Sequence, residues 1–66
     1  MNPVRDFRVG YHGSISLLFP MTPAAKVWVL ENLPADHQTF GKAIVVEARY
    51  LDPILDGIVS DGLSVA

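Results

Sequence analysis

The chain has 66 residues, half of them hydrophobic, no cysteine and a formal net charge of −2 with five basic side chains. This length allows a single domain, residues 1–66, and the lack of cysteine excludes disulfides and thiolate metal sites. The acidic balance disfavours a dedicated nucleic-acid-binding protein, which usually has a basic surface. No apolar run is long enough to span a membrane and the first residues contain no apolar signal region, so we expect a cytoplasmic protein.

A β-hairpin is predicted at the start of the chain. The alternating polarity of residues 4–11 has the period of a half-buried strand. Its apolar side holds three side chains that we expect in the core: Phe7, Val9 and Tyr11. Two glycines over residues 10–14 favour a tight turn. A second strand over residues 15–19 follows, and it ends at Pro20 because proline cannot donate a hydrogen bond to a neighbouring strand.

A helix is predicted from Pro23 to about Leu33. Thr22 is a suitable N-cap because its hydroxyl can accept a hydrogen bond from the first turn, and proline fits the first helical position. Pro34 is the stop signal. The expected core side of this helix comprises Ala24, Ala25, Trp28, Val29 and Leu33.

The connection over residues 34–42 is expected to place Phe40 back on the core, with Gly41 turning the chain. The next strand, Ala43–Tyr50, is the most apolar of the sequence. Because both of its faces carry apolar side chains, we expect it at the centre of the sheet.

A second helix is predicted from Pro53, with Asp52 as its N-cap and Asp56 in its first turn. Its apolar stripe comprises Ile54, Leu55, Ile58 and Val59. Gly62 is suited to the position after the helix end, followed by the apolar contact of a Schellman motif. Residues Leu63–Val65 are expected to form a short edge strand.

These elements give the order β-β-α-β-α-(β). We therefore predict an α+β fold, a two-layer sandwich in which two helices cover one face of a small mixed sheet.

The helix over residues 23–33 is apolar on two sides. Val27 and Leu30 lie between Lys26 and Glu31 on the side away from the expected core. One explanation is that Phe40 or its connecting segment covers them. The second is a homodimer or partner surface, and the third is ordinary scattered exposure of single apolar residues.

No group of residues predicts catalysis, a metal or a cofactor. His12 and His37 lie in predicted turns, and a metal site would need both together with a carboxylate such as Asp36. The chain has no nucleophile-elbow motif, so an enzyme built around either histidine is the least favoured alternative. Glu47 and Arg49 are expected to pair as charges across strands.

A set of core and capping residues resembles small stand-alone bacterial proteins of unassigned function. The set comprises Gly13-Ser14-Ile15, Leu17-Leu18, Thr22, Ala24-Ala25, Trp28, Val45-Val46-Glu47 and Arg49-Tyr50. The resemblance covers residues 13–63. It implies a compact bacterial cytoplasmic domain and brings no catalytic residues with it.

The favoured function is a small non-enzymatic binding or protein-interaction module, either a homodimer or bound to another protein, acting through the helix over residues 23–33 or a sheet edge. The alternative is an anion-, ligand- or nucleic-acid-binding accessory protein. Its site would be the helix start or the first hairpin with Arg5 and Arg8. The helix-start residues are Thr22, Ala24, Ala25 and Lys26.

Overall fold

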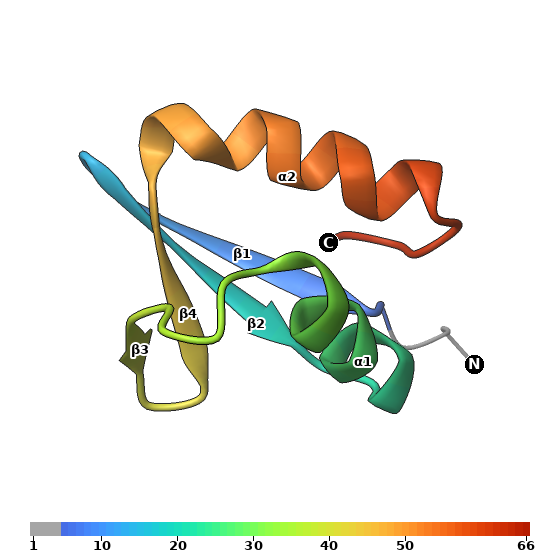
Figure 1. Ribbon diagram of the computed structural model, residues 1–66. Helices are drawn as coiled ribbons and strands as arrows, with labels where there is room; N and C mark the ends of the chain where they lie inside the picture. Colours follow the sequence, from blue (N-terminus) through green and yellow to red (C-terminus); the bar gives the residue numbers. More distant parts are fainter. Residues whose placement is uncertain (1–4) are drawn as a thin grey trace.

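Four strands and two helices follow one another in the order β-β-α-β-β-α in the computed structural model, which describes residues 5–66 (Figure 1). The strands are β1 (Phe7–His12), β2 (Ile15–Pro20), β3 (Thr39–Phe40) and β4 (Ala43–Glu47). The helices are α1 (Pro23–Asn32) and α2 (Ala48–Ser60). The strands form one antiparallel sheet in the order β1-β2-β4-β3, and both helices pack on one face of it. The predicted α+β class is confirmed, and β4 lies inside the sheet as expected.

Both hairpins are closed by two-residue turns that begin with glycine. Gly13 joins β1 to β2 with a φ of +68°, and Gly41 joins β3 to β4 with a φ of +60°. The residue after each glycine has a negative φ, which is the sign pattern of a type II′ turn. The predicted turns are confirmed. Val4, the first residue of the predicted strand 4–11, lies outside the described residues.

Helix α1 begins where the sequence predicts. The Thr22 hydroxyl accepts a hydrogen bond from the N–H of Ala25 at 3.1 Å, and Pro23 occupies the first turn. Leu33 is the C-cap. Ala25, Trp28 and Val29 are buried as predicted, whereas Ala24 is exposed.

The start of α2 differs from the prediction. Strand β4 ends at Glu47 and the helix begins at Ala48, so the expectations of a strand to Tyr50 and a helix start at Pro53 are wrong. Asp52 therefore lies inside the helix and does not cap it.

Helix α2 begins earlier than predicted because the earlier start buries Leu51. In a helix Leu51 lies seven residues before Ile58, so both fall on the side that faces the sheet, and both are buried. This burial offsets the backbone hydrogen bond that Pro53 cannot donate inside the helix. Asp56 is consequently one turn further along the helix than expected, outside the first turn.

Helix α2 ends in the predicted Schellman motif. Gly62 has a φ of +83°, and its N–H donates to the carbonyl of Val59 at 3.0 Å. The N–H of Leu63 donates to the carbonyl of Ile58 at 3.1 Å, which completes the pair of hydrogen bonds that defines the motif.

The C-terminal residues return to β1. Val65 forms an isolated parallel bridge with Phe7 in place of the expected edge strand, so the sheet itself is antiparallel and not mixed as predicted. Beside it, the Asp6 carboxylate accepts hydrogen bonds from the Thr22 hydroxyl at 2.6 Å and from the Ser64 N–H at 3.0 Å. Asp6 therefore joins β1, α1 and the C-terminal segment at one point.

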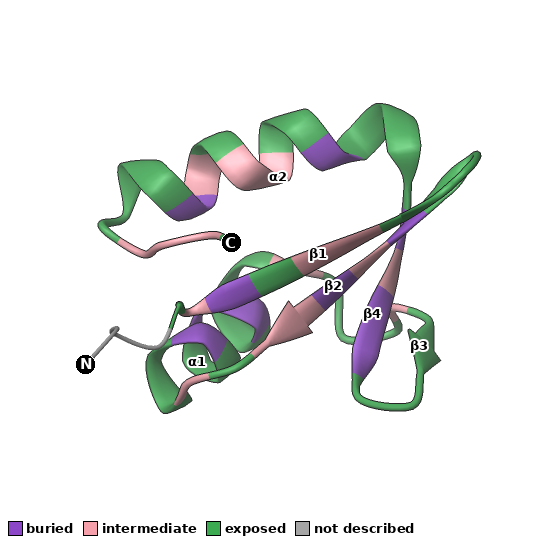
Figure 2. Ribbon diagram, turned by 180° about the vertical axis from the view of Figure 1, so that it is seen from behind, coloured by how far each residue is buried: buried purple, intermediate pink, exposed green. Residues whose placement is uncertain are grey.

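The core lies between the sheet and the two helices, where the buried residues of each layer face one another (Figure 2). Trp28 is its largest side chain and is 7% exposed. Its indole packs edge-to-face on Phe7, with ring centroids 5.9 Å apart, and its N–H donates to an Asp61 carboxylate oxygen at 2.7 Å. Gly57 of α2 lies beside the indole, where an added Cβ would make an ordinary van der Waals contact at 3.4 Å.

Two aromatic residues expected in the core are outside it. Tyr11 is 72% exposed, because the end of the first hairpin extends past the start of α2 (Figure 1). Phe40 is 71% exposed, because it pairs with Ala43 in the edge hairpin and does not fold back onto the helices.

Candidate functional site

The face of the sheet opposite the helices is the most distinctive surface of the protein. Side chains alternate along a strand, so directly paired residues share a face. Leu18, which is buried against the helices, pairs with Val9 and with Ile44. The residues next to these three along each strand therefore point away from the helices. Two of them, Arg8 beside Val9 and Phe19 beside Leu18, pair directly. We call this second surface the open face.

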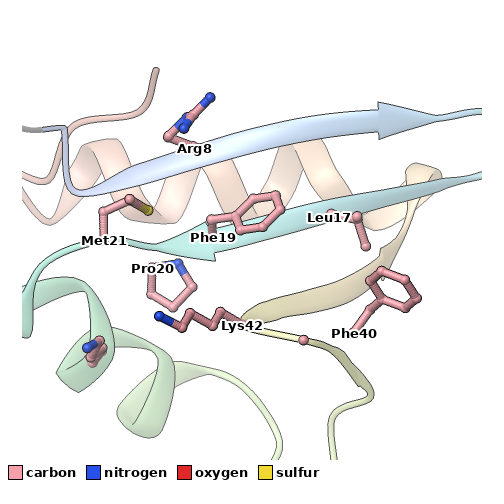
Figure 3. A pocket seen from close by; sticks show the side chains of 9 residues that line it. Arg8, Leu17, Phe19, Pro20, Met21, Phe40 and Lys42 are labelled. Carbon is pink, nitrogen blue, oxygen red and sulfur yellow. The ribbon is translucent and has the colours of Figure 1, made fainter.

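A groove of about 850 Å³ lies on the open face (Figure 3). Six of the side chains that line it are Arg8, Leu17, Phe19, Lys26, Phe40 and Lys42. We call these six residues the basic groove. Its floor is apolar, and Figure 3 shows Arg8 and Lys42 on opposite sides of the Phe19 ring. An anionic ligand with apolar or aromatic parts matches this combination.

Each basic side chain reaches the groove from a different element. Arg8 is on β1, and Lys42 is in the turn between β3 and β4. Lys26 is in α1, which begins two residues after β2 ends and lies beside the end of that strand (Figure 3). Convergence on one surface therefore depends on the strand order β1-β2-β4-β3 and on the short link between β2 and α1.

The groove carries unbalanced positive charge. No Asp or Glu lines it, although the chain has seven acidic residues and a net charge of −2. Within residues 5–66 the single ion pair joins Arg49 Nε to Glu47 Oε2 at 2.9 Å. The sequence predicted charge pairing across two strands. In the structure, the pair forms at the start of α2. Three of the five basic side chains, those of the groove, therefore have no carboxylate partner among the described residues.

The predicted anion site at the start of α1 is occupied by the protein itself. The N–H of Ala25 donates to the Thr22 hydroxyl, and this hydroxyl donates to Asp6. The hydrogen bonds from Thr22 and then Ser64 hold the pKa of Asp6 below its ordinary value, so a carboxylate already stands at this helix end. Ala24 is exposed beside it, and Lys26 lines the basic groove instead.

The second predicted surface, on α1, is open. Val27 and Leu30 are 52% and 80% exposed, and Lys26 and Glu31 beside them are exposed too. The expectation that Phe40 covers them is wrong, because Phe40 lies on the open face of the sheet. Positions 27 and 30 are three residues apart, so both side chains lie on one helix face.

The two histidines and the first-hairpin arginines are placed apart. His12 is exposed at the end of β1, whereas His37 is half-buried and its Nδ1 lies 2.7 Å from the Pro34 carbonyl oxygen. That oxygen can only accept, so Nδ1 donates. Of the two arginines predicted as a pair, Arg8 lines the basic groove and Arg5 does not.

A second groove, of about 710 Å³, lies where β4 continues beyond the short strand β3. Apolar side chains such as Leu33, Ile44 and Ile54 dominate it. Its ionisable residues are His37, Glu47 and Tyr50. Its lining contains one carboxylate and no lysine or arginine. The basic groove is therefore the stronger candidate for recognising a charged ligand.

The sequence indicated two of the six residues of the basic groove. Arg8 and Lys26 were singled out for binding, but in two separate sites. Phe40 and Lys42 were missed, because Phe40 was assigned to the core. The available signal was the dipeptide Gly41-Lys42 between Phe40 and Ala43, which fits a two-residue hairpin turn and places both flanking residues on one sheet face.

Comparisons of this chain with family models, with curated proteins and with solved structures give no match. Over residues 5–66, neither helix has the length and apolar character needed to cross a membrane.

Proposed function

We propose that the protein is a small non-enzymatic binding module whose ligand is a polyanion held in the basic groove. The observation that carries the proposal is the convergence of Arg8, Lys26 and Lys42 on one groove with no carboxylate partner, in a chain that is acidic overall. Like charges that gather without a counter-charge repel one another, so a bound anion relieves this repulsion.

The shape of the groove favours an extended ligand. It is open to solvent along the sheet, and its cations come from β1, α1 and the β3–β4 turn. Charges on separate elements can each contact a different anionic group of a polymer. A small anion would contact fewer of them and would leave the apolar floor uncovered.

Retention on a phosphocellulose column in a salt gradient tests this proposal. Contacts between cationic side chains and phosphates release counterions, so retention falls as salt rises. Lys26→Ala combined with Lys42→Ala should shift elution to clearly lower salt. The matched control, Arg5→Ala with Arg49→Ala, removes the same charge outside the groove and should elute close to the wild type. Equal shifts for both pairs would show that overall charge, and not the groove, determines retention.

A second candidate function is protein interaction through α1. The exposure of Val27 and Leu30 on one helix face favours it, since adjacent exposed apolar side chains often mark an interface. Both a homodimer and a different protein partner are consistent with this surface. Light scattering on a sizing column tests the homodimer. Val27→Glu with Leu30→Lys should abolish any dimer, and a monomeric wild type would exclude self-association through this surface.

A further inference from the structure

We infer that the polyanion bound by the basic groove is a single-stranded nucleic acid. The inference rests on the proposed function and deepens it by naming the ligand. It is carried by an exposed aromatic side chain, Phe40, that shares the groove with Phe19 and with three unpaired cations.

The position of Phe40 has no explanation in the packing of the fold. It is 71% exposed, on the two-residue strand β3, and lies on the face opposite the helices. Phe19 is half-buried on the same face and pairs directly with Arg8. Figure 3 shows the rings of Phe19 and Phe40 on the same side of the sheet, with Leu17 between them.

Aromatic rings flanked by cations match the two parts of a single strand. Unpaired bases stack on aromatic side chains, while Lys and Arg contact the phosphates that connect them. Phe19 and Phe40 offer two rings, and Arg8, Lys26 and Lys42 offer charges at the margins of the groove. A site of this size would hold a short segment of a few nucleotides.

Other polyanions use less of the groove. A duplex keeps the flat faces of its bases stacked inside and therefore offers none of them to the rings of Phe19 and Phe40. The carboxylates of an acidic peptide would pair with the cations, but its flexible side chains would not stack on a flat ring such as that of Phe40. Both alternatives therefore predict that the shape of the Phe40 side chain is unimportant, and this difference can be measured.

Three phosphate contacts also set the expected salt dependence. For a single strand the slope of log K against log salt is about −0.7 for each phosphate, which gives about −2 for three. Binding should then weaken about 20-fold between 50 and 200 mM salt. Replacing Lys42 by alanine should reduce the slope to about −1.4, because one contact is lost.

Fluorescence anisotropy with labelled oligo-dT and oligo-U 12-mers at 50 mM salt tests the inference, with unlabelled polyphosphate and poly-glutamate as competitors. Phe40→Ala should weaken oligonucleotide binding about 5- to 150-fold, the range for loss of one base stack. Phe40→Leu, which keeps apolar bulk without the ring, should also weaken it while polyphosphate binding is unchanged. Tyr11→Leu is the matched control, since Tyr11 is 72% exposed and lies outside the groove. Because both side chains are exposed, far-UV circular dichroism should show intact folds.

The outcomes separate this inference from the proposed function. Oligonucleotide binding that depends on Phe40, to either the DNA or the RNA strand, supports both. Equal competition by polyphosphate with no effect of Phe40→Leu would overturn the nucleic-acid inference and leave a polyanion module. Stronger competition by poly-glutamate would also overturn it, in favour of an acidic protein partner. Failure of the wild type to bind any of these polyanions would refute the proposed function as well.

Discussion

Replacing Trp28 by alanine should bring the whole domain close to unfolding. Trp28 is the only tryptophan and is 7% exposed, between Phe7 on the sheet and Gly57 on α2. It also donates the hydrogen bond to Asp61 that connects α1 with the end of α2. Its removal therefore affects both helices and the sheet at once.

The magnitude follows from the buried area. A tryptophan side chain buries on the order of 250 Å², which at about 25 cal/mol per Å² gives an upper bound of about 6 kcal/mol. Alanine retains part of this area, and measured substitutions of large aromatic residues cost about 3–5 kcal/mol. A domain of this length has a total stability of about 3–10 kcal/mol, so the loss is comparable with the whole.

Urea unfolding followed by far-UV circular dichroism measures the effect, because the Trp28→Ala chain has no tryptophan fluorescence. Asp61→Ala isolates the hydrogen bond and should cost about 0.5–1.5 kcal/mol. Val27→Ala, on the exposed side of the same helix, should change stability by less than about 0.5 kcal/mol. If Trp28→Ala retained the wild-type midpoint and Val27→Ala did not, the assignment of the buried side of α1 would be refuted.

Three other positions test separate features of the fold by the same method. Asp6→Ala should destabilise the protein at neutral pH, because the pKa of Asp6 in the folded protein lies below its ordinary value of 3.8. The stabilisation by Asp6 is therefore complete above pH 3.8 and is lost as the pH falls through the lower pKa of the folded state. A loss that persisted unchanged in acid would contradict a charge-dependent role. Gly57→Ala should be neutral or stabilising by up to about 1 kcal/mol, because alanine favours a helix and its Cβ would make an ordinary contact with Trp28 at 3.4 Å. Gly57→Val should destabilise the protein. Gly62→Ala should cost about 1–2 kcal/mol, because φ at this position is +83°, and a neutral result would show that the Schellman turn can rearrange.

Local sequence signals predicted the parts of the fold that depend on neighbouring residues. The Thr22-Pro23 pair located the start of α1, and Gly62 located the end of α2, because caps and positive φ angles restrict residue type strongly. The start of α2 was missed because residues 48–50 alternate like a strand. The helix is favoured because it buries Leu51 against the sheet. This contact joins residues far apart in the sequence, so a local sequence pattern does not reveal it.

The composition of the open face could not be predicted for a related reason. Alternation along β2 separates Leu17 and Phe19 from Ser16 and Leu18, but both sets contain large apolar side chains. The structure buries Ser16 and Leu18 under the helices and leaves the more apolar set on the open face. Hydrophobicity alone favours the opposite choice, so the pattern of β2 could not identify which face the helices cover.

The separation of the two faces makes the proposed polyanion ligand compatible with an acidic protein. The net charge of −2 disfavours a polyanionic ligand, but a net charge sums over surfaces that face in different directions. Helix α2 and its C-cap carry Asp52, Asp56 and Asp61 on the helix layer, whereas Lys26 and Lys42 line the basic groove. A polyanion that approaches the helix layer is repelled, and one that approaches the open face is attracted. Under the proposed function, this charge distribution would orient the ligand toward the groove. Neutralising the three aspartates should therefore strengthen non-specific binding more than binding that depends on Phe40.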